Sequence, residues 1–534
     1  MTKRPNIVLV LADDMGFSDL GCYGGEIFTP NLDSLARDGA RFSQFYNTAR
    51  CSPSRASLLT GLHPHQTGIG ILTNNDLPRG YAGNLNRRCA TLAETLKVAG
   101  YSTCLSGKWH LATDMHTPND TWPTRRGFDR FFGTLTGCGS FYTPGTLTRG
   151  ESDATAEALD PTFFYTDAIA AHAAEFVEEQ AAVGNPFFLY AAFTAPHWPL
   201  HAPAEDIARY EGRFDEGWDA LREKRLKRLV EEGILPADTA LSERDPTQPA
   251  WADTEEKAWQ ARRMEAYAAQ IEGMDRGIGK IVEALKGSGV FENTLFIFLS
   301  DNGASPEDLP QFDVEKFMQR ADILPRATRD GWPMRVGNTP DIIPGAEDTY
   351  ASYGRAWANL SNTPFRFYKR WVHEGGIATP LIVHWPAGGL ESGAILDVPA
   401  QLVDIVPTVL EVTGASYPPP ALGREVAPLE GRSLLPALKG ETLPENPLYW
   451  EHTGNAAIRI GRWKLVREEP NDWELYDLAV DRTELNDLAA SNPEIVADLA
   501  AKWQAWATRV GVIPWDVTVS IYVERGLHPT WAAG

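Results

Sequence analysis

Short apolar runs recur along this 534-residue chain, and several of them stop at a polar side chain. Five runs of this kind occupy residues 6–12, 101–106, 187–193, 295–300 and 380–385. Short runs that are apolar on both faces are typical of strands in a sheet that is buried on both sides. We therefore expect these runs to form the centre of a largely parallel sheet.

Predicted helices separate these strands. Helical segments are expected at residues 32–39, 91–99, 166–180 and 261–285, and Gly100 stands where a C-terminal cap would follow the second of them. Strands that alternate with helices predict an α/β fold, with a large mixed, mostly parallel sheet sandwiched by helices. Ligands bind such sheets at the carboxyl ends of the strands, which is where the polar residues fall.

Three further parts of the chain depart from this alternation. Residues 202–261 are polar, charged and rich in Trp, which predicts a helical insertion, and residues 313–358 predict a long irregular loop that flanks the site. Residues 457–466 alternate apolar and polar side chains and predict one half-buried antiparallel strand. Residues 473–478 would be its partner, and 493–510 would form an amphipathic helix. We expect a main domain over residues 1–443 and a smaller C-terminal α+β subdomain over 444–534.

The charge balance limits the classes of partner. With 49 basic and 71 acidic side chains the formal net charge is -22, which disfavours a nucleic acid or an anionic membrane as partner. No apolar stretch approaches the roughly 20 residues of a membrane span. Residues 6–12 are short for the apolar part of a signal peptide, so we interpret them as the first strand. The five cysteines are odd in number and lack metal-type spacing, which favours reduced thiols in a cytoplasm.

Acidic and amide side chains follow two of the predicted strands. Asp13 and Asp14 come after the first apolar run, and Asp301 and Asn302 come after the run at 295–300. Adjacent residues of a regular strand point to opposite faces, so both aspartates can face one ion only beyond the strand end. A double Asp alone is usually a solvated strand cap. Three carboxylates and an amide oxygen at one sheet edge instead suit Ca²⁺ or Mg²⁺.

Cys51 begins the most specific segment of the chain. Pro53 stands where a helix would begin, which places Cys51 at or just before a helix N-terminus. The helix dipole and the free amides there favour anions and lower the pKa of a thiol. Arg55 lies one helical turn further on and faces the same region. A structural cysteine beside a capped helix is the alternative.

The residues from Cys51 to Arg55, with Leu59-Thr60-Gly61 after them, resemble the signature of the sulfatase family, Cys-X-Pro-X-Arg followed by Leu-Thr-Gly. The resemblance covers at least residues 6–407 and is strongest to the cytosolic bacterial arylsulfatases of the alkaline phosphatase superfamily. It extends to the following motifs: Asp13-Asp14, Gly107-Lys108-Trp109-His110, Pro196-His197, Asp301-Asn302-Gly303, Pro364-Phe365-Arg366, Lys369 and His373-Glu374-Gly375-Gly376.

This resemblance implies hydrolysis of aryl or alkyl sulfate esters to a phenol or alcohol and inorganic sulfate. Cys51 would be oxidised after synthesis to formylglycine, whose hydrate attacks sulfur and gives a sulfated formylglycine-diol intermediate. One Ca²⁺ would be held by oxidised Cys51 together with Asp13, Asp14, Asp301 and Asn302. The partners implied are a small-molecule sulfate ester and, transiently, the formylglycine-generating maturation enzyme, with the chain as a monomer or small homo-oligomer.

The resemblance also implies roles for the cationic residues. Lys108 and Lys369 would bind the sulfate and neutralise its oxygens. His110 would accept a proton from the second hydroxyl of the hydrate, and His197 would bind the substrate and protonate or otherwise stabilise the leaving oxygen. Arg55 would hold the nucleophile and the metal ligands in place.

Two rival functions use the same residues. A phosphonate monoester or phosphodiester hydrolase would need the same nucleophile and metal, because both kinds of ester present a singly charged tetrahedral group. A catalytically silent protein that captures sulfated ligands would need a lost catalytic group, and none is missing.

Other candidates carry weaker signals. His63 and His65 resemble a metal pair, but we expect His65 in a surface loop, and we expect His373 and Glu374 to orient the turn that follows them. Four aromatic residues favour either an aromatic leaving group or a packed core: Trp109, Phe141, Tyr142 and Trp198. The remaining cysteines are expected to be buried or inert thiols: Cys22, Cys89, Cys104 and Cys138.

Overall fold

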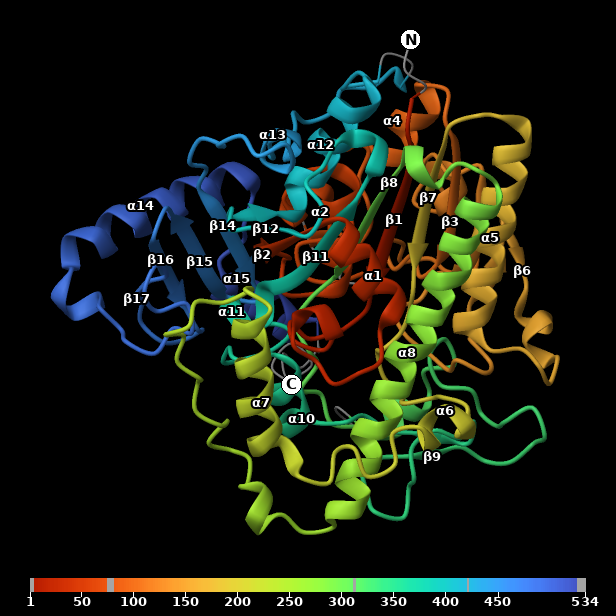
Figure 1. The fold of residues 1–534 in the computed structure, drawn as a ribbon, viewed down its shortest axis with the longest axis horizontal. Helices are drawn as coiled ribbons and strands as arrows, with labels where there is room; N and C mark the ends of the chain where they lie inside the picture. Colours follow the sequence, from red (N-terminus) through yellow and green to blue (C-terminus); the bar gives the residue numbers. More distant parts are fainter. Residues whose placement is uncertain (1–3, 74–80, 311–313, 420–421, 526–534) are drawn as a thin grey trace.

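The computed structural model describes residues 4–73, 81–310, 314–419 and 422–525. Its centre is a sheet that has 11 strands within these residues, in the order β12-β2-β11-β8-β1-β7-β3-β4-β5-β6, with β13 beside β2 (Figure 1). The strands are β1 (Asn6–Ala12), β2 (Ala40–Tyr46), β3 (Ser102–Gly107), β4 (Arg130–Thr134), β5 (Leu147–Arg149), β6 (Ser152–Asp153), β7 (Phe187–Ala192), β8 (Thr294–Ser300), β11 (Ala378–His384), β12 (Ala394–Leu396) and β13 (Ala400–Gln401).

The middle of this sheet is parallel. Strands β8, β1, β7, β3 and β4 pair in parallel, whereas β11 runs antiparallel to both β8 and β2. The edge strands β5 and β6 are also antiparallel to their neighbours. Each of the five apolar runs forms one of the strands, so the prediction of a mixed, mostly parallel sheet is confirmed.

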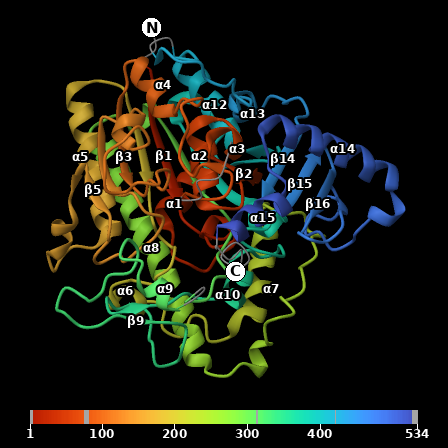
Figure 2. The same ribbon diagram turned by 180° about the vertical axis from the view of Figure 1, so that it is seen from behind.

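Helices cover both faces of the sheet. In β1, Val8 and Val10 pack into the core beneath α1, α5 and α8, whereas Ile7 and Leu9 pack into the core beneath α2, α4 and α12. Figures 1 and 2 show these layers from opposite sides. Among the described helices, none offers the apolar length that a membrane crossing would require. The helices of the two layers are α1 (Pro30–Asp38), α2 (Cys51–Thr60), α4 (Leu92–Val98), α5 (Tyr165–Val183), α8 (Lys257–Gly287) and α12 (Ile405–Thr413).

Residues 202–261 contain α6 (Ala204–Ala208) and α7 (Gly217–Glu231), which lie at the lower end of α8 in Figure 1. Trp218 of α7 packs edge to face against Trp251 and against Trp357 of α10 (Arg355–Ser361), with ring centroids 4.7 and 5.2 Å apart. These Trp residues therefore extend the core that lies beneath α1, α5 and α8.

The predicted irregular loop contains a few short elements, joined by chain without regular structure. Its first residue, 313, lies outside the described residues. The short elements are α9 (Val314–Met318), β9 (Arg335–Val336) and β10 (Thr349–Tyr350). Other short helices elsewhere in the chain are α3 (Pro64–Thr67), α11 (Glu374–Ile377), α13 (Leu435–Leu438) and α15 (Trp515–Glu524).

The C-terminal part forms an antiparallel sheet in the order β14-β15-β16-β17, with α14 (Pro493–Val510) on one face. The prediction of one strand over 457–466 is wrong, because a two-residue turn at Gly461 and Arg462 divides it into two paired strands. Ile460 and Trp463 are three residues apart, so strict alternation would have put them on opposite faces. Gly461 has φ of +56°, which suits a tight hairpin turn. The strands are β14 (Leu448–His452), β15 (Asn455–Ile460), β16 (Trp463–Arg467) and β17 (Glu474–Asp477).

A buried ion cluster joins this sheet to the rest of the molecule. Lys464 of β16 lies 2.9 Å from a carboxylate oxygen of Glu374 and 2.8 Å from one of Glu484, and all three side chains are fully buried. Arg482 reaches Glu374 at 3.3 Å, and Tyr46 of β2 donates to the same carboxylate at 3.0 Å. Besides starting the turn at Gly375, Glu374 thus anchors the C-terminal sheet.

Replacing Lys464 by Met should destabilise the protein strongly. The substitution keeps the apolar stem but leaves Glu374 and Glu484 buried beside each other without their shared cation, which costs on the order of 3–5 kcal/mol. We expect the midpoint of thermal unfolding to fall by several degrees. Lys502→Met on the exposed face of α14, whose partner Asp498 is also exposed, is the matched control and should leave the midpoint unchanged. Equal midpoints for the two variants would contradict the anchoring role.

Candidate active site

The carboxyl ends of the central strands bring the predicted site residues together. Asp13 and Asp14 follow β1, Asp301 and Asn302 follow its neighbour β8, and Lys108 follows β3. The remaining members come from other elements: Cys51 and Arg55 from α2, His110 from the loop after β3, His197 from the loop after β7, and Lys369 from the loop before α11. The structure thus gathers into one cluster residues that are more than 300 positions apart in the sequence.

Cys51 is the first residue of α2. Arg50 before it has extended backbone angles, and the whole helix is buried, with Cys51 itself 3% exposed. The Cys51 Sγ atom lies 3.8 Å from Oδ1 of Asp14. Burial raises the pKa of the Cys51 thiol, and the charges of Lys108 and Lys369 offset this only in part. The expectation of a lowered thiol pKa is therefore wrong, because desolvation outweighs the helix N-terminus.

The acidic residues form a compact set of oxygen atoms. Asp14 has a left-handed backbone with φ of +67°, and its N–H donates to Oδ1 of Asp301 at 3.2 Å. The Asn302 amide donates to Oδ1 of Asp14 at 2.6 Å. Among the described residues, Oδ1 of Asp13 and Oδ1 of Asn302 are buried without a hydrogen-bond partner. Such orphaned oxygens beside carboxylates are what a hard cation would satisfy.

The donor set fits a metal ion. One ligand atom from each of Asp13, Asp14, Cys51 and His197 lies within 4.8 Å of all the others. Burial raises the pKa of Asp13 to about 7, opposed by Lys108 and reinforced by the charge of Asp301. A divalent cation would reverse this effect, because it favours the charged carboxylate. The carboxylate oxygens of Asp13 and Asp14 favour Ca²⁺ or Mg²⁺, whereas the Cys51 sulfur and the His197 nitrogen of the same set are softer donors.

The carboxylates of Asp13, Asp14 and Asp301 each contact a buried cationic side chain. Lys108 Nζ lies 2.6 Å from Oδ2 of Asp13, and Lys369 Nζ lies 2.8 Å from Oδ2 of Asp14. Arg55 holds Oδ2 of Asp301 with two nitrogens, at 2.8 and 3.0 Å. A fork-shaped contact of this kind fixes the orientation of the carboxylate as well as its charge.

The two histidines lie close to these charges. Nδ1 of His197 lies 2.6 Å from the Trp198 carbonyl oxygen, so it carries the hydrogen, and Nε2 lies 3.3 Å from Oδ2 of Asp14 and 3.4 Å from Nζ of Lys369. Burial lowers the pKa of His197 to about 4. Burial, and then the charge of Lys108, lower the pKa of His110 well below its ordinary value. Both imidazoles are therefore neutral near pH 7 in this arrangement.

His110 is held in an uncommon conformation. Its φ is +54°, in the left-handed region, and its Nδ1 is buried without a partner among the described residues. A Cβ added at Gly137 would come within 2.3 Å of the His110 ring, so the ring lies directly on that glycine. The chain accepts backbone strain at His110 to aim the ring at the cluster.

Glu307 belongs to the cluster and was not found from the sequence. Its carboxylate lies 3.0 Å from Arg50 and 3.4 Å from Lys369, and it accepts a hydrogen bond from the Trp198 indole at 2.7 Å. Although burial opposes it, the charges of Lys369 and Arg50 hold the pKa of Glu307 below its ordinary value. Glu307 lies in an irregular segment with no recognisable motif, so no pattern pointed to it.

Several weaker candidates are placed differently from expectation. The surface position expected for His65 is wrong: the side chain is buried, and its Nε2 lies 2.7 Å from Glu451 of β14. His63 and His65 both pack edge to face on Trp506 of α14, which covers the region from a remote part of the sequence. Trp109 is a core residue that packs against Phe128. Within the described residues the cysteines form no disulfide, and Cys138 is half-buried.

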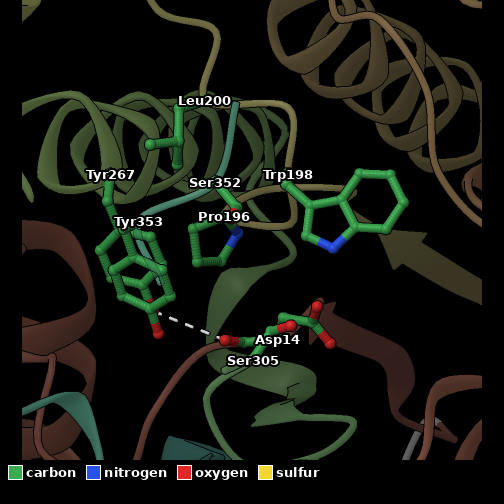
Figure 3. Close-up of a pocket in the computed structure, with 8 residues that line it drawn as sticks. All are labelled: Asp14, Pro196, Trp198, Leu200, Tyr267, Ser305, Ser352 and Tyr353. Carbon is green, nitrogen blue, oxygen red and sulfur yellow. Dashed lines mark hydrogen bonds between the residues drawn. The ribbon is translucent and has the colours of Figure 1, made fainter. Parts of the chain in front are cut away.

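A small cavity of about 10 Å³ lies beside Asp14 (Figure 3). The rings of Tyr267 and Tyr353 stack at 4.2 Å on one side of Asp14, and the indole of Trp198 lies on the other. The Tyr267 hydroxyl donates to the Asp14 carbonyl at 3.5 Å. The cavity has room for about one water molecule and is therefore too small to hold a substrate.

Comparison with known proteins decides the family. Residues 5–415 match the family model named Sulfatase, and residues 365–507 match the model for the C-terminal region of N-sulphoglucosamine sulphohydrolase. The chain belongs to the sulfatase family. The sulfatase is therefore a hydrolase of sulfuric esters and a member of the alkaline phosphatase superfamily, as the sequence motifs predicted.

Individual relatives match over nearly the whole chain. The sulfatase is 34% identical to an uncharacterised sulfatase of Schizosaccharomyces pombe, over 96% of this chain and 95% of that protein. It is also 34% identical to an arylsulfatase of Klebsiella aerogenes, over 81% of this chain and 91% of the other. The crystal structure of Ps i-CgsB covers 97% of each chain with a TM-score of 0.67 and 25% identity. The fold and the family are thus shared over both the large and the C-terminal sheets.

Calcium should raise the midpoint of thermal unfolding of chelator-treated protein, because an ion that binds the folded state stabilises it by about 2.7 kcal/mol at a hundredfold excess over its Kd. Asp13→Asn should lose most of this increase, measured from its own metal-free midpoint, which should be lower than that of the wild type because buried Lys108 loses its carboxylate partner. Asp498→Asn on exposed α14 is the control and should keep the full increase. A full calcium response in Asp13→Asn would contradict the ligand assignment.

The rise in the midpoint of thermal unfolding that calcium causes should depend on pH. The raised pKa of Asp13, about 7, means that metal-free folded protein keeps a proton that the unfolded chain releases near its ordinary value of 3.8. The contribution of Asp13 to the stability of metal-free protein is therefore present below about pH 4 and is lost as pH rises to about 7. Calcium must displace this proton, so its effect on the midpoint should grow up to about pH 7 and then level off. A response that is constant over this range would rule out proton competition at Asp13.

Proposed function

We propose that this sulfatase hydrolyses aryl or alkyl sulfate esters to a phenol or alcohol and inorganic sulfate, with residue 51 as a formylglycine and one Ca²⁺ in the acidic cluster. The supporting observation is the position of the Cys51 side chain, whose Sγ lies 3.8 Å from Asp14 and on whose charge Lys108 and Lys369 act. These two lysines contact Asp13 and Asp14. This arrangement offers a nucleophile, a metal site and an anion site at one point.

The metal would be held by residue 51 and by Asp13, Asp14, Asp301 and Asn302. Oδ1 of Asp13 and Oδ1 of Asn302 are buried without a hydrogen-bond partner among the described residues, which fits a hard cation. The formylglycine hydrate would supply an oxygen nucleophile. A bound cation would lower the pKa of its hydroxyl and neutralise negative charge on the sulfate. Arg55 would keep Asp301 oriented toward the ion through its two hydrogen bonds. Its role is to position a ligand rather than to contact the ester.

Lys108 and Lys369 would bind the sulfate group. Both ammonium charges act on the Cys51 side chain from buried positions, and they come from different loops. Preorganised cations in a dry site stabilise the negative charge that develops on sulfate oxygens without reorganising solvent. Their carboxylate partners keep them charged and in place before substrate arrives.

His110 and His197 would move protons. Neutral His110 can take up the proton from the second hydroxyl of residue 51, because its lowered pKa leaves it unprotonated. His197 directs Nε2 toward Asp14 and Lys369, so this nitrogen can protonate the leaving oxygen once it has gained a proton. The negative charges of the Asp14 carboxylate and of a bound ester would both favour the protonated form of His197.

The remaining expectations are part of the same proposal. Residues 1–443 would carry the chemistry and 444–534 would form the C-terminal subdomain. The small-molecule ester and the maturation enzyme would be the partners, and the unpaired, mostly buried cysteines support a cytoplasmic site of action. The phosphonate alternative is not favoured, because the family model that matches residues 5–415 and the two relatives at 34% identity are sulfatases.

A peptide mass across residue 51 tests the nucleophile. Protein made with the maturation machinery should show an aldehyde in place of CH₂SH, together with metal-dependent turnover of an aryl sulfate. Cys51→Ala should lose activity by at least about a thousandfold while keeping its fold. Full turnover by protein with an unmodified thiol would disprove the mechanism. Higher kcat/KM on an aryl phosphonate than on the matched aryl sulfate would overturn the substrate class.

Lys108→Met and His110→Gln should separate binding from proton transfer. Losing the buried ammonium should reduce kcat/KM by roughly a hundredfold to a thousandfold for every aryl sulfate. His110→Gln should reduce turnover by a similar factor through release of sulfate, so a burst of phenol should precede a slow steady state. Absence of a burst in the His110 variant, measured by rapid mixing, would contradict the proton-acceptor role.

A further inference from the structure

Arg370 is a half-buried cation without an anion. Its guanidinium lies over the Trp371 ring at 5.2 Å, and its Nε is buried without a partner. No carboxylate of the described residues lies within ion-pair distance of it. The carboxylate of Glu468 acts on the charge of Arg370, but it accepts a hydrogen bond from the Trp371 indole at 2.8 Å. Burial, and then the charge of Arg50, lower the pKa of Arg370 to about 10.

Arg50 is a second cation in the same place. The backbone N–H of Arg370 donates to the backbone carbonyl of Ala49 at 2.7 Å, so the segments that carry Arg50 and Arg370 lie side by side. Arg50 shares its one carboxylate partner, Glu307, with Lys369, and its own Nε has no partner among the described residues. The charge of Arg50 also acts on Arg370, and Glu307 forms an ion pair with Arg50 but not with Arg370. A further anion beside Arg370 would therefore lower the free energy of this partly dehydrated site.

The two arginines lie on the solvent side of the site. Cys51, Lys108, His197 and Lys369 expose no more than 4% of their surface, whereas the Arg50 side chain is 15% exposed and Arg370 is half-buried. Arg50 precedes the nucleophile in the chain, and Arg370 follows a sulfate-binding lysine. An ester whose sulfate lies at residue 51 must direct its leaving group away from the buried side, toward this exposed margin.

We propose that Arg50 and Arg370 bind a second anionic group, a carboxylate or a second sulfate, carried by the leaving group of the substrate. The inference rests on the proposed function and narrows its substrates to sulfate esters that are at least dianionic. A pair of guanidinium groups suits the planar, two-oxygen face of a carboxylate and the oxygens of a sulfate. In a chain of net charge -22, these arginines give the site the local positive charge that such a substrate needs.

Matched aryl sulfates test this subsite. We expect matured, calcium-loaded enzyme to prefer para- or meta-sulfooxybenzoate over the corresponding sulfooxybenzamide by about tenfold or more in kcat/KM. The amide withdraws electrons more strongly and is the better leaving group, so leaving-group chemistry opposes the expected preference. A second comparison, para-phenylene bis-sulfate against para-methoxyphenyl sulfate, tests a second sulfate as the anion. Whichever pair shows the preference identifies the group that is bound.

Variants connect the preference to the two arginines. In Arg370→Gln and Arg50→Gln the ratio of kcat/KM for the anionic ester to that for its neutral analogue should fall toward one. Arg370→Lys should restore part of this ratio. Arg88→Gln, which removes an exposed positive charge elsewhere, should keep the wild-type ratio. Absence of any preference in the wild-type enzyme, or an unchanged ratio in Arg370→Gln, would overturn the subsite.

Calorimetry distinguishes failure of the subsite from failure of the proposed function. Protein that keeps the thiol at residue 51 can be titrated with the same acid and amide pairs in the presence of calcium. Tenfold tighter binding of the acid, lost in Arg370→Gln, would support the subsite even if matured enzyme turned over neither ester. Equal affinities for acid and amide would overturn it even in an active sulfatase.

Discussion

Buried carboxylates at the carboxyl edge of the sheet must be neutralised, and the rest of the site follows from this requirement. Asp13, Asp14 and Asp301 sit where two adjacent strands end, and unpaired charges there would cost several kcal/mol each. The compensating cations come from three separate elements: Arg55 from α2, Lys108 from the loop after β3 and Lys369 from the loop before α11. Charge pairing therefore fixes how these elements sit on the sheet.

The same requirement extends outward from the metal ligands. Glu307 links Lys369 to Arg50, so the network of alternating charge continues from the buried ligands to the exposed margin. At that margin the alternation stops at Arg370. Glu374 lies a few residues beyond Lys369, and buried Lys464 between Glu374 and Glu484 attaches the C-terminal sheet through the same kind of charge pairing.

The features that short-range sequence patterns encode could be predicted from the sequence. The apolar runs located the strands, and the strand ends located Asp13, Asp14, Asp301 and Asn302, because parallel strands end at one edge. The sequence did not predict Glu307 or the burial of His65, since their partners, Arg50 and Glu451, lie more than 250 positions away. The raised pKa of Cys51 was missed for a related reason. A helix N-terminus is visible in sequence, but the depth at which tertiary packing buries it is not.

Under the proposed function, the complete burial of α2 has a consequence for the order of folding and maturation in the cell. Every residue from Cys51 to Thr60 is buried, so a second enzyme cannot bind this segment once folding is complete. Under the proposed function, oxidation of residue 51 has to take place while the segment is still extended and accessible. The competition between synthesis, folding and maturation would then set the active fraction permanently, and a molecule that folds too early would keep its thiol for its lifetime.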